Sequence, residues 1–264
     1  MPTARPSDRV GVNTPWCKAL LYCVWSFLIL VGGAAPAAAQ SADTACVKCH
    51  KEIGADKVVH AALKDGCVKC HSTLDGSVSP HKNSGDVKGG LSAKGSALCY
   101  TCHDRAAFAK KKRHAALGRC TNCHDAHSSK HDKLLTEDAS TLCFGCHERK
   151  DFEAKFKHEP AAEGNCLACH DAHASDEPPL LTASATKVCL DCHKKVPKSP
   201  HAAAGFSSRG HPVGGEKPGL ADPARPDQPF YCGSCHDPHK SDSARLIRYE
   251  DRPPLGFCQK CHQK

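Results

Sequence analysis

Residues 120–127 read CTNCHDAH, and this stretch contains the two features that decide what the whole chain folds around. Cys120, Cys123 and His124 form a Cys-x-x-Cys-His unit, which is the signature of c-type haem attachment. The two thiols bind the two vinyl groups on one edge of the porphyrin, and the adjacent histidine is placed under the iron as proximal ligand. His127 follows only three residues later and needs an explanation of its own.

The same unit occurs nine times and accounts for every cysteine after residue 39. We number the motifs one to nine in chain order and expect one covalent haem c at each. A zinc site does not require a histidine directly after Cys-x-x-Cys, and disulfides give that histidine no role. The expected haem-attaching cysteines are Cys46, Cys49, Cys67, Cys70, Cys99, Cys102, Cys120, Cys123, Cys143, Cys146, Cys166, Cys169, Cys189, Cys192, Cys232, Cys235, Cys258 and Cys261.

The histidines are numerous enough to supply two ligands to every one of the nine irons, with one histidine left over. The chain has 19 histidines. The expected proximal ligands are His50, His71, His103, His124, His147, His170, His193, His236 and His262. The expected distal ligands are His60, His81, His114, His127, His158, His173, His201, His211 and His239, which leaves His131 as the spare. Because the only methionine is Met1, His–Met ligation, which raises haem potential, is not expected in the mature chain.

Chain reach restricts which irons these histidines serve. Two histidines on opposite sides of one iron have Cα atoms about 12 Å apart, because each metal–nitrogen bond is about 2 Å. Three extended residues span at most about 10–11 Å. His127 therefore cannot share an iron with His124, and the same holds for His173 and His239 with their own motifs. These three histidines are expected to bind a neighbouring haem.

The chain divides into a leader and a repeat region. An apolar run from about Ala19 to Val31 follows the basic residues Arg5, Arg9 and Lys18, and an A-x-A cleavage site ends at Ala39. We interpret residues 1–39 as a cleaved signal peptide, with an uncleaved anchor as the alternative. Residues 40–264 form a nonahaem domain of CxxCH repeats about 22 residues long, with a Pro/Gly-rich insertion at 194–231.

Repeats of this length predict a mostly irregular fold with short α-helices and almost no β structure. At roughly 25 residues per haem, the polypeptide is too short to bury an ordinary apolar core. We expect an elongated molecule wrapped around a chain of stacked haems, with helices around and after the motifs, for example over 139–156. The segment 214–229 is too rich in Pro and Gly to predict regular structure.

The basic charge does not indicate nucleic-acid binding. The formal charge is +8 for the full chain. Each haem carries two propionates, so nine haems outweigh the excess of Lys and Arg, and we expect no nucleic-acid partner.

With its motifs in this order, the chain resembles the paired-CxxCH multihaem cytochromes c, a group that includes periplasmic pentahaem and decahaem electron carriers. The pattern of a CxxCH motif, a later histidine and a CxxCHxxH motif is matched three times. The matches are Cys99–His103 with His114 and Cys120–His127, Cys143–His147 with His158 and Cys166–His173, and Cys189–His193 with His201 or His211 and Cys232–His239. The first pair departs from the pattern by reading CHSTL, and the ninth motif is left unpaired.

The resemblance implies closely stacked, mostly bis-histidine, low-potential haems that relay single electrons in the cell envelope, as in extracellular or anaerobic respiration. On this reading the protein is an electron carrier and not an enzyme. It is exported to the periplasm or to the outer membrane and cell exterior, and its partners are other redox proteins such as cytochromes, quinol oxidases or terminal reductases. The alternative is a subunit of an extracellular cytochrome filament or the haem insert of an outer-membrane porin. A nitrite- or sulfite-type reductase fits less well, because none of the nine motifs is a variant.

Overall fold

The computed structural model describes residues 41–196, 221–249, 256–260 and 262. The chain divides into two units, Met1–Ala39 and Gln40–Lys264. The leader, most of the insertion, His201, His211 and Cys261 lie outside the described residues, so the interpretations placed on them stay predictions.

The described helices are short, and most of them carry an odd-numbered motif. Cysteines of motifs one, three, five, seven and nine lie in α1 (Ser41–Cys49), α2 (Ser96–Cys99), α3 (Ala139–Phe144), α5 (Ala185–Cys192) and α6 (Gly256–Gln259), respectively. The remaining described helix, α4, spans Glu159–Ala162 and holds no motif cysteine. Even-numbered motifs begin instead in single 3-10 turns, η2 (Cys67–Lys69), η6 (Cys120–Asn122), η9 (Cys166–Ala168) and η11 (Cys232–Ser234). The motifs therefore alternate between two local backbone forms.

The helix expected over 139–156 is shorter than the sequence predicted. Helix α3 begins after Asp138, whose carboxylate accepts the Thr141 backbone N–H at 3.1 Å, and it ends at Phe144. Gly145 follows, and glycine has low helix propensity. The chain continues as a 3-10 turn, Arg149–Phe152, and then as strand β6 (Phe156–Lys157).

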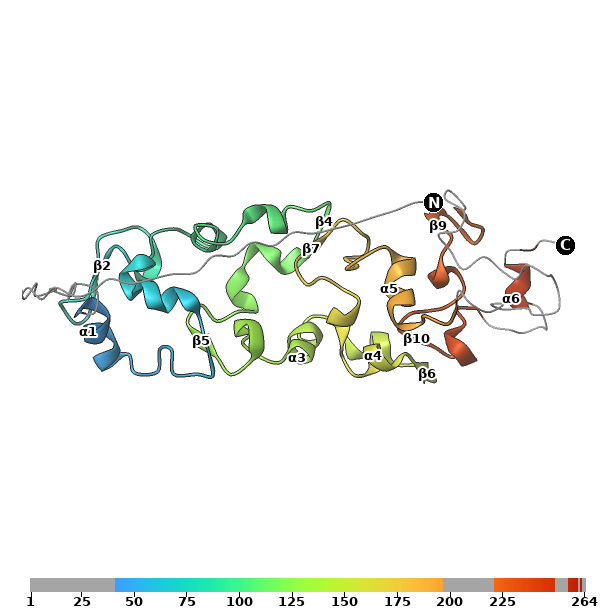
Figure 1. Cartoon of the computed structure of the whole chain (residues 1–264), viewed down its shortest axis with the longest axis horizontal. Helices are drawn as coiled ribbons and strands as arrows, with labels where there is room; N and C mark the ends of the chain where they lie inside the picture. Colours follow the sequence, from blue (N-terminus) through green and yellow to red (C-terminus); the bar gives the residue numbers. More distant parts are fainter. Residues whose placement is uncertain (1–40, 197–220, 250–255, 261, 263–264) are drawn as a thin grey trace, which may run out of the picture. The chain divides into compact units, whose positions relative to one another are not determined.

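Short strands make the long-range connections of this fold. Strand β1 (Val58–Val59) pairs with β5 (Ser128–Ser129), β4 (Lys112–Arg113) with β7 (Ala174–Ser175), and β6 with β10 (Lys240–Ser241), all antiparallel. Figure 1 shows β4 beside β7 and β6 beside β10, although the paired segments are far apart in sequence. Two local hairpins, β2 (Leu74–Asp75) with β3 (Lys82–Asn83) and β8 (Ala221–Asp222) with β9 (Arg225–Pro229), complete the described strands. We expected almost no β structure, and the strands are indeed very short. That expectation did not include their role in connecting distant segments.

The polypeptide alone has almost no apolar interior. Among the described residues Ala174 is the only buried apolar side chain, and Ser128, Ser129, Ser175, Asp222 and Ser234 are the buried polar ones. Within the same ranges, no helix has the length and apolar character of a membrane span. In this part of the chain the polypeptide buries no ordinary apolar core, as its length per repeat predicted.

The hairpin β8–β9 corrects the expectation that 214–229 lacks regular structure, as far as that segment is described. Strand β9 contains Pro226 and Pro229, and it pairs on one side only, as is typical of strands that contain proline. The fully buried Asp222 carboxylate closes the hairpin by accepting hydrogen bonds from Arg225 at 2.6 and 2.8 Å. Sequence composition does not reveal a buried ion pair.

Replacing Asp222 by alanine is expected to destabilise this hairpin by about 3 kcal/mol, because Arg225 is left without its buried partner. Hydrogen exchange of the β8–β9 amides measures the loss. The double variant D222A/R225A is expected to lose less, and D227A, at an exposed position of the same hairpin, about 0.5 kcal/mol or less. Equal losses in D222A and D227A would contradict the role of the buried pair.

Candidate functional site

Each of the nine motifs closes one helical turn in the same way. The backbone N–H of the motif histidine donates to the carbonyl of the first motif cysteine, four residues earlier, at 2.8–3.0 Å. This bond occurs in odd and even motifs alike. It places the histidine and the first cysteine one turn apart, so that the histidine lies beside the attachment point.

The histidine of the CHxxH stretches is held by a tight turn built around an aspartate. Asp171 accepts the backbone N–H groups of His173 and Ala174 at 2.8 and 3.1 Å. Burial opposes ionisation of Asp171, but these two hydrogen bonds, together with the nearby Lys110 and His173, lower the pKa of the carboxyl group. Asp125 and Asp237 hold His127 and His239 by the same backbone bonds. The repeated Asp therefore fixes where the second histidine lies.

Three backbone hydrogen bonds join these CHxxH histidines to histidines of distant loops. His60 donates to the His127 carbonyl at 2.8 Å, His114 to His173 at 2.8 Å, and His158 to His239 at 2.9 Å. Each bond continues one of the three long-range strand pairs, β1–β5, β4–β7 and β6–β10. The strands therefore bring two histidines from separate parts of the sequence side by side.

Imidazole rings lie close together in seven pairs. Each pair joins one motif histidine with one of the other histidines, and the ring centres are 5.9–6.2 Å apart. The pairs are His50–His81, His71–His127, His103–His60, His124–His173, His147–His114, His170–His239 and His193–His158. The seven non-motif histidines that pair were all candidates for distal ligands.

This separation fits an iron atom between two imidazoles. A metal–nitrogen bond of about 2 Å and about 1.1 Å from nitrogen to ring centre, counted on both sides, give about 6 Å. Direct stacking of two rings favours an offset or edge-to-face contact, and a repeated gap near 6 Å leaves room for an atom on the line between them. The residues present therefore fit a six-coordinate haem iron.

Hydrogen bonds also leave the correct ring nitrogen available. Nδ1 of His124 lies 2.9 Å from the Lys133 carbonyl oxygen, and Nδ1 of His60 lies 2.8 Å from that of Ala126. A carbonyl only accepts, so Nδ1 carries the proton and Nε2 of the neutral ring keeps a lone pair for a metal. The rings of His71, His81, His158, His170 and His236 make the same kind of bond.

Burial keeps two of the other imidazoles neutral. It lowers the pKa of His173, and the nearby His124 lowers it further. Burial likewise lowers the pKa of His239, with His170 as the second cause. Neutral imidazole is the form that binds a metal.

His131, the expected spare, differs from the seven paired non-motif histidines. His131 precedes the 3-10 turn Asp132–Leu134, and its backbone N–H donates to the Ser129 hydroxyl at 2.9 Å. Its ring belongs to none of the seven pairs. No three or more His, Cys, Asp or Glu side chains gather into a bare-metal site in the described ranges, and no disulfide joins the cysteines there.

Consecutive motifs lie next to each other through their cysteines. Burial raises the pKa of the Cys99 thiol, and the adjacent Cys120 of motif four raises it further. Burial and Cys166 of motif six raise the pKa of Cys143 to about 11. A hydrogen bond with Cys232 of motif eight is the main cause of the raised pKa of Cys189. Helix α1 contacts η2, which brings motif one beside motif two.

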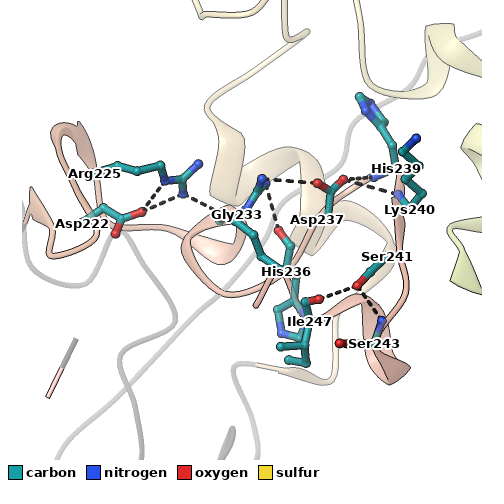
Figure 2. A network of polar contacts seen from close by, with 11 residues as sticks. Asp222, Arg225, Gly233, His236, Asp237, His239, Lys240, Ser241, Ser243 and Ile247 are labelled. Carbon is teal, nitrogen blue, oxygen red and sulfur yellow. Dashed lines mark hydrogen bonds and ion pairs between the residues drawn. The ribbon is translucent and has the colours of Figure 1, made fainter. Parts of the chain in front are cut away.

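Two arginines that sequence reasoning did not single out hold motif eight, and Figure 2 shows one of them, Arg225, beside Gly233. Arg225 and Arg248 both donate to the Gly233 carbonyl, at 2.8 and 3.0 Å, and Arg248 also lies 3.2 Å from the Asp237 carboxylate. Thr136 and Thr182 occupy the place of Arg248 in motifs four and six, where their hydroxyls donate to Cys123 and Cys169. Aligning the three repeats shows that an arginine replaces the threonine here, and this difference could have drawn attention to Arg248 from the sequence.

The imidazole pairs and the cysteine turns define a class of protein, the multihaem c-type cytochromes. The doubled CXXCH motif family matches residues 60–108, 114–152, 158–198 and 222–264, more than half of the chain, and the protein belongs to this family. It binds haem c covalently and has the electron-transfer role of that family. No curated protein matches the chain.

The family matches correct the grouping of the motifs. They pair motif two with three, four with five, six with seven and eight with nine. The ninth motif, which the sequence pattern left unpaired, is therefore paired, and motif one at Cys46–His50 stands outside the matches. We call the four matched stretches units one to four. Units two and three begin with a loop histidine, His114 and His158, as unit one begins with His60.

Proposed function

We propose that this protein carries nine haems and relays single electrons between redox proteins outside the cytosol. The observation that carries the proposal is the set of seven imidazole pairs with ring centres 5.9–6.2 Å apart. Each pair supplies both axial ligands of one haem iron, and the haem supplies the one-electron redox chemistry. The chain holds each ring in place by backbone hydrogen bonds, strand pairs and packing.

A simple rule assigns the ligands within the units. The loop histidine at the start of a unit serves the second haem of that unit, as His60 serves the haem at motif three. The CHxxH histidine serves the first haem of the preceding unit, as His127 serves the haem at motif two. Unit one has no preceding unit, which accounts for CHSTL in place of CHxxH at motif two. His81 serves the haem at motif one.

The same contacts support a relay in chain order. Motifs three and four, five and six, and seven and eight meet at their cysteines. Units are joined by the hydrogen bonds His114 to His173 and His158 to His239. Haems attached at neighbouring motifs then lie close enough for electrons to pass from each to the next.

Ligation by two histidines and the lack of methionine after residue 39 favour low potentials. Low-potential haems suit anaerobic or extracellular respiration, with cytochromes, quinol oxidases or terminal reductases as donor and acceptor. Covalent haem attachment outside the cytosol and the leader predicted at 1–39 support export to the periplasm or the outer membrane. We therefore propose an electron carrier and not a reductase.

Low-temperature EPR and optical spectra of the purified protein, with haem and iron quantified per chain, test this function. We expect nine haems, all low-spin, and reduction well below the range of His–Met cytochromes. A high-spin ferric signal that responds to nitrite, sulfite or cyanide would instead indicate a reductase. The mass of the purified particle separates a monomer from a filament.

A further inference from the structure

The imidazoles of two CHxxH histidines, His173 and His239, lack the hydrogen bond that fixes seven other candidate ligand rings. Seven rings, including those of His60 and His124, are fixed by a hydrogen bond from Nδ1 to a carbonyl oxygen. In the part of the chain that the structure describes, no hydrogen bond reaches the ring of His173 or His239. Rotation of these rings about their bond to a metal must be limited by packing.

Phenylalanine rings provide that packing. The Phe108 ring lies 5.2 Å from the His173 ring with the planes at 78°, an edge contact. The Phe152 ring lies 5.3 Å from the His239 ring with the planes at 57°. Aromatic pairs at this separation and inclination are favourable, and an apolar ring on one side also excludes water from the imidazole.

Each phenylalanine is itself held by the preceding odd motif. Phe108 contacts Tyr100, which lies between the cysteines of motif three, with ring centres 5.8 Å apart. Phe152 contacts Phe144, in the same place of motif five, at 5.6 Å. The Arg149 guanidinium covers the Phe144 ring at 3.9 Å, and Arg105 lies 5.8 Å from the Tyr100 ring. The same four-residue arrangement therefore occurs twice.

The third CHxxH histidine provides a comparison within the molecule. Phe108 and Phe152 each stand six residues before the loop histidine of their repeat, and Gly54 occupies that position before His60. His127 has its Nδ1 3.8 Å from the Asp125 carboxylate. All three CHxxH histidines have an aspartate nearby, but His127 lacks the phenylalanine contact that His173 and His239 make.

We propose that Phe108 and Phe152 are positioning residues, which set the plane of the distal imidazole and keep water from it at the haems of motifs four and six. The proposal rests on the proposed function, since it requires His173 and His239 to be iron ligands. An oxidised haem core carries one more positive charge than a reduced one, so apolar cover favours the reduced form. These two haems should be easier to reduce than they would be without the phenylalanine.

The variants F108L and F152L test this in the full holoprotein, followed by EPR-monitored redox titration. The largest g value of a low-spin bis-histidine haem depends on the angle between its two imidazole planes. We expect one signal, equal to one spin, to move in each single variant and two in the double variant. At the midpoint potential of the parent protein, the oxidised-to-reduced ratio of the affected haem should rise about threefold. This corresponds to a midpoint potential lower by about 30 mV, at 59 mV per tenfold change for one electron.

The controls distinguish a failure of the positioning role from a failure of the proposed function. F156L removes a phenylalanine of strand β6 that contacts Lys155, and it should leave every signal in place. F108Y keeps the ring and should retain the parent signal. Should F108L fail to fold, F152L with F152Y makes the same test at motif six. Unmoved signals in both leucine variants, or equal shifts in F156L, would overturn the positioning role, whereas high-spin haems in the parent protein would overturn the proposed function.

Discussion

Replacing His173 by alanine is expected to convert one haem from low-spin to high-spin, and that haem is the one attached at motif four. The His173 and His124 rings have centres 5.9 Å apart, the spacing of two imidazoles that share an iron. His170, in the same motif as His173, pairs with His239 instead. Loss of one axial ligand leaves the iron five-coordinate or bound to water, which EPR and optical spectra detect as one high-spin haem per chain.

A second background identifies which haem changes. In C120A/C123A no haem attaches at motif four, so adding H173A there should produce no further high-spin signal. If His173 served the haem of motif six, the signal would appear in that background as well. H131A is the matched control, since His131 stands outside the imidazole pairs and its loss should leave all haems low-spin.

The second large effect is expected from preventing haem attachment, which should abolish the fold. Among the described residues only Ala174 is a buried apolar side chain, so the polypeptide has little to offset the entropy of ordering its chain. Small metal-dependent domains are unfolded without their metal for the same reason. A chain with alanine at the cysteines of all nine motifs should show no persistent structure by circular dichroism.

Hydrogen exchange makes this prediction more specific. In the holoprotein the amides of His60, His114 and His158 should be protected, because each donates to the carbonyl of a CHxxH histidine. In the cysteine-free chain these amides should exchange at the rate of an unstructured peptide. Protection of all three amides in both proteins would show that the strand pairs form without haem, and would contradict the prediction that the fold requires haem attachment.

Much of the site could be predicted from single residues and their spacing. The Cys-x-x-Cys-His units required only local chemistry, and each forms the same turn in the structure. Chain length alone excluded His127 from the iron of His124, and its ring indeed lies opposite His71. The count of histidines left one spare, and His131 was chosen because its surroundings fit the repeat least well; its ring belongs to none of the seven pairs.

Other features could not be predicted because they depend on residues far apart in the chain. The helix expected over 139–156 stops at Phe144, where Gly145 and the motif turn interrupt it. The ion pair of Asp222 with Arg225 and the packing of Phe108 on His173 leave no periodic pattern in the sequence. Aligning the three CHxxH repeats shows that Arg248 replaces a threonine, but only the structure shows that it donates to the Gly233 carbonyl beside Arg225.

The sequence by itself determined the chemistry of this protein, because haem attachment and proximal ligation use residues at most four positions apart. Only the tertiary structure decided which distal histidine meets which motif. That choice depends on strand pairs such as β4–β7, whose members are held together across long stretches of chain. A two-residue strand has too little pattern to predict its partner, and the cost of closing a long loop changes too slowly with length to select one.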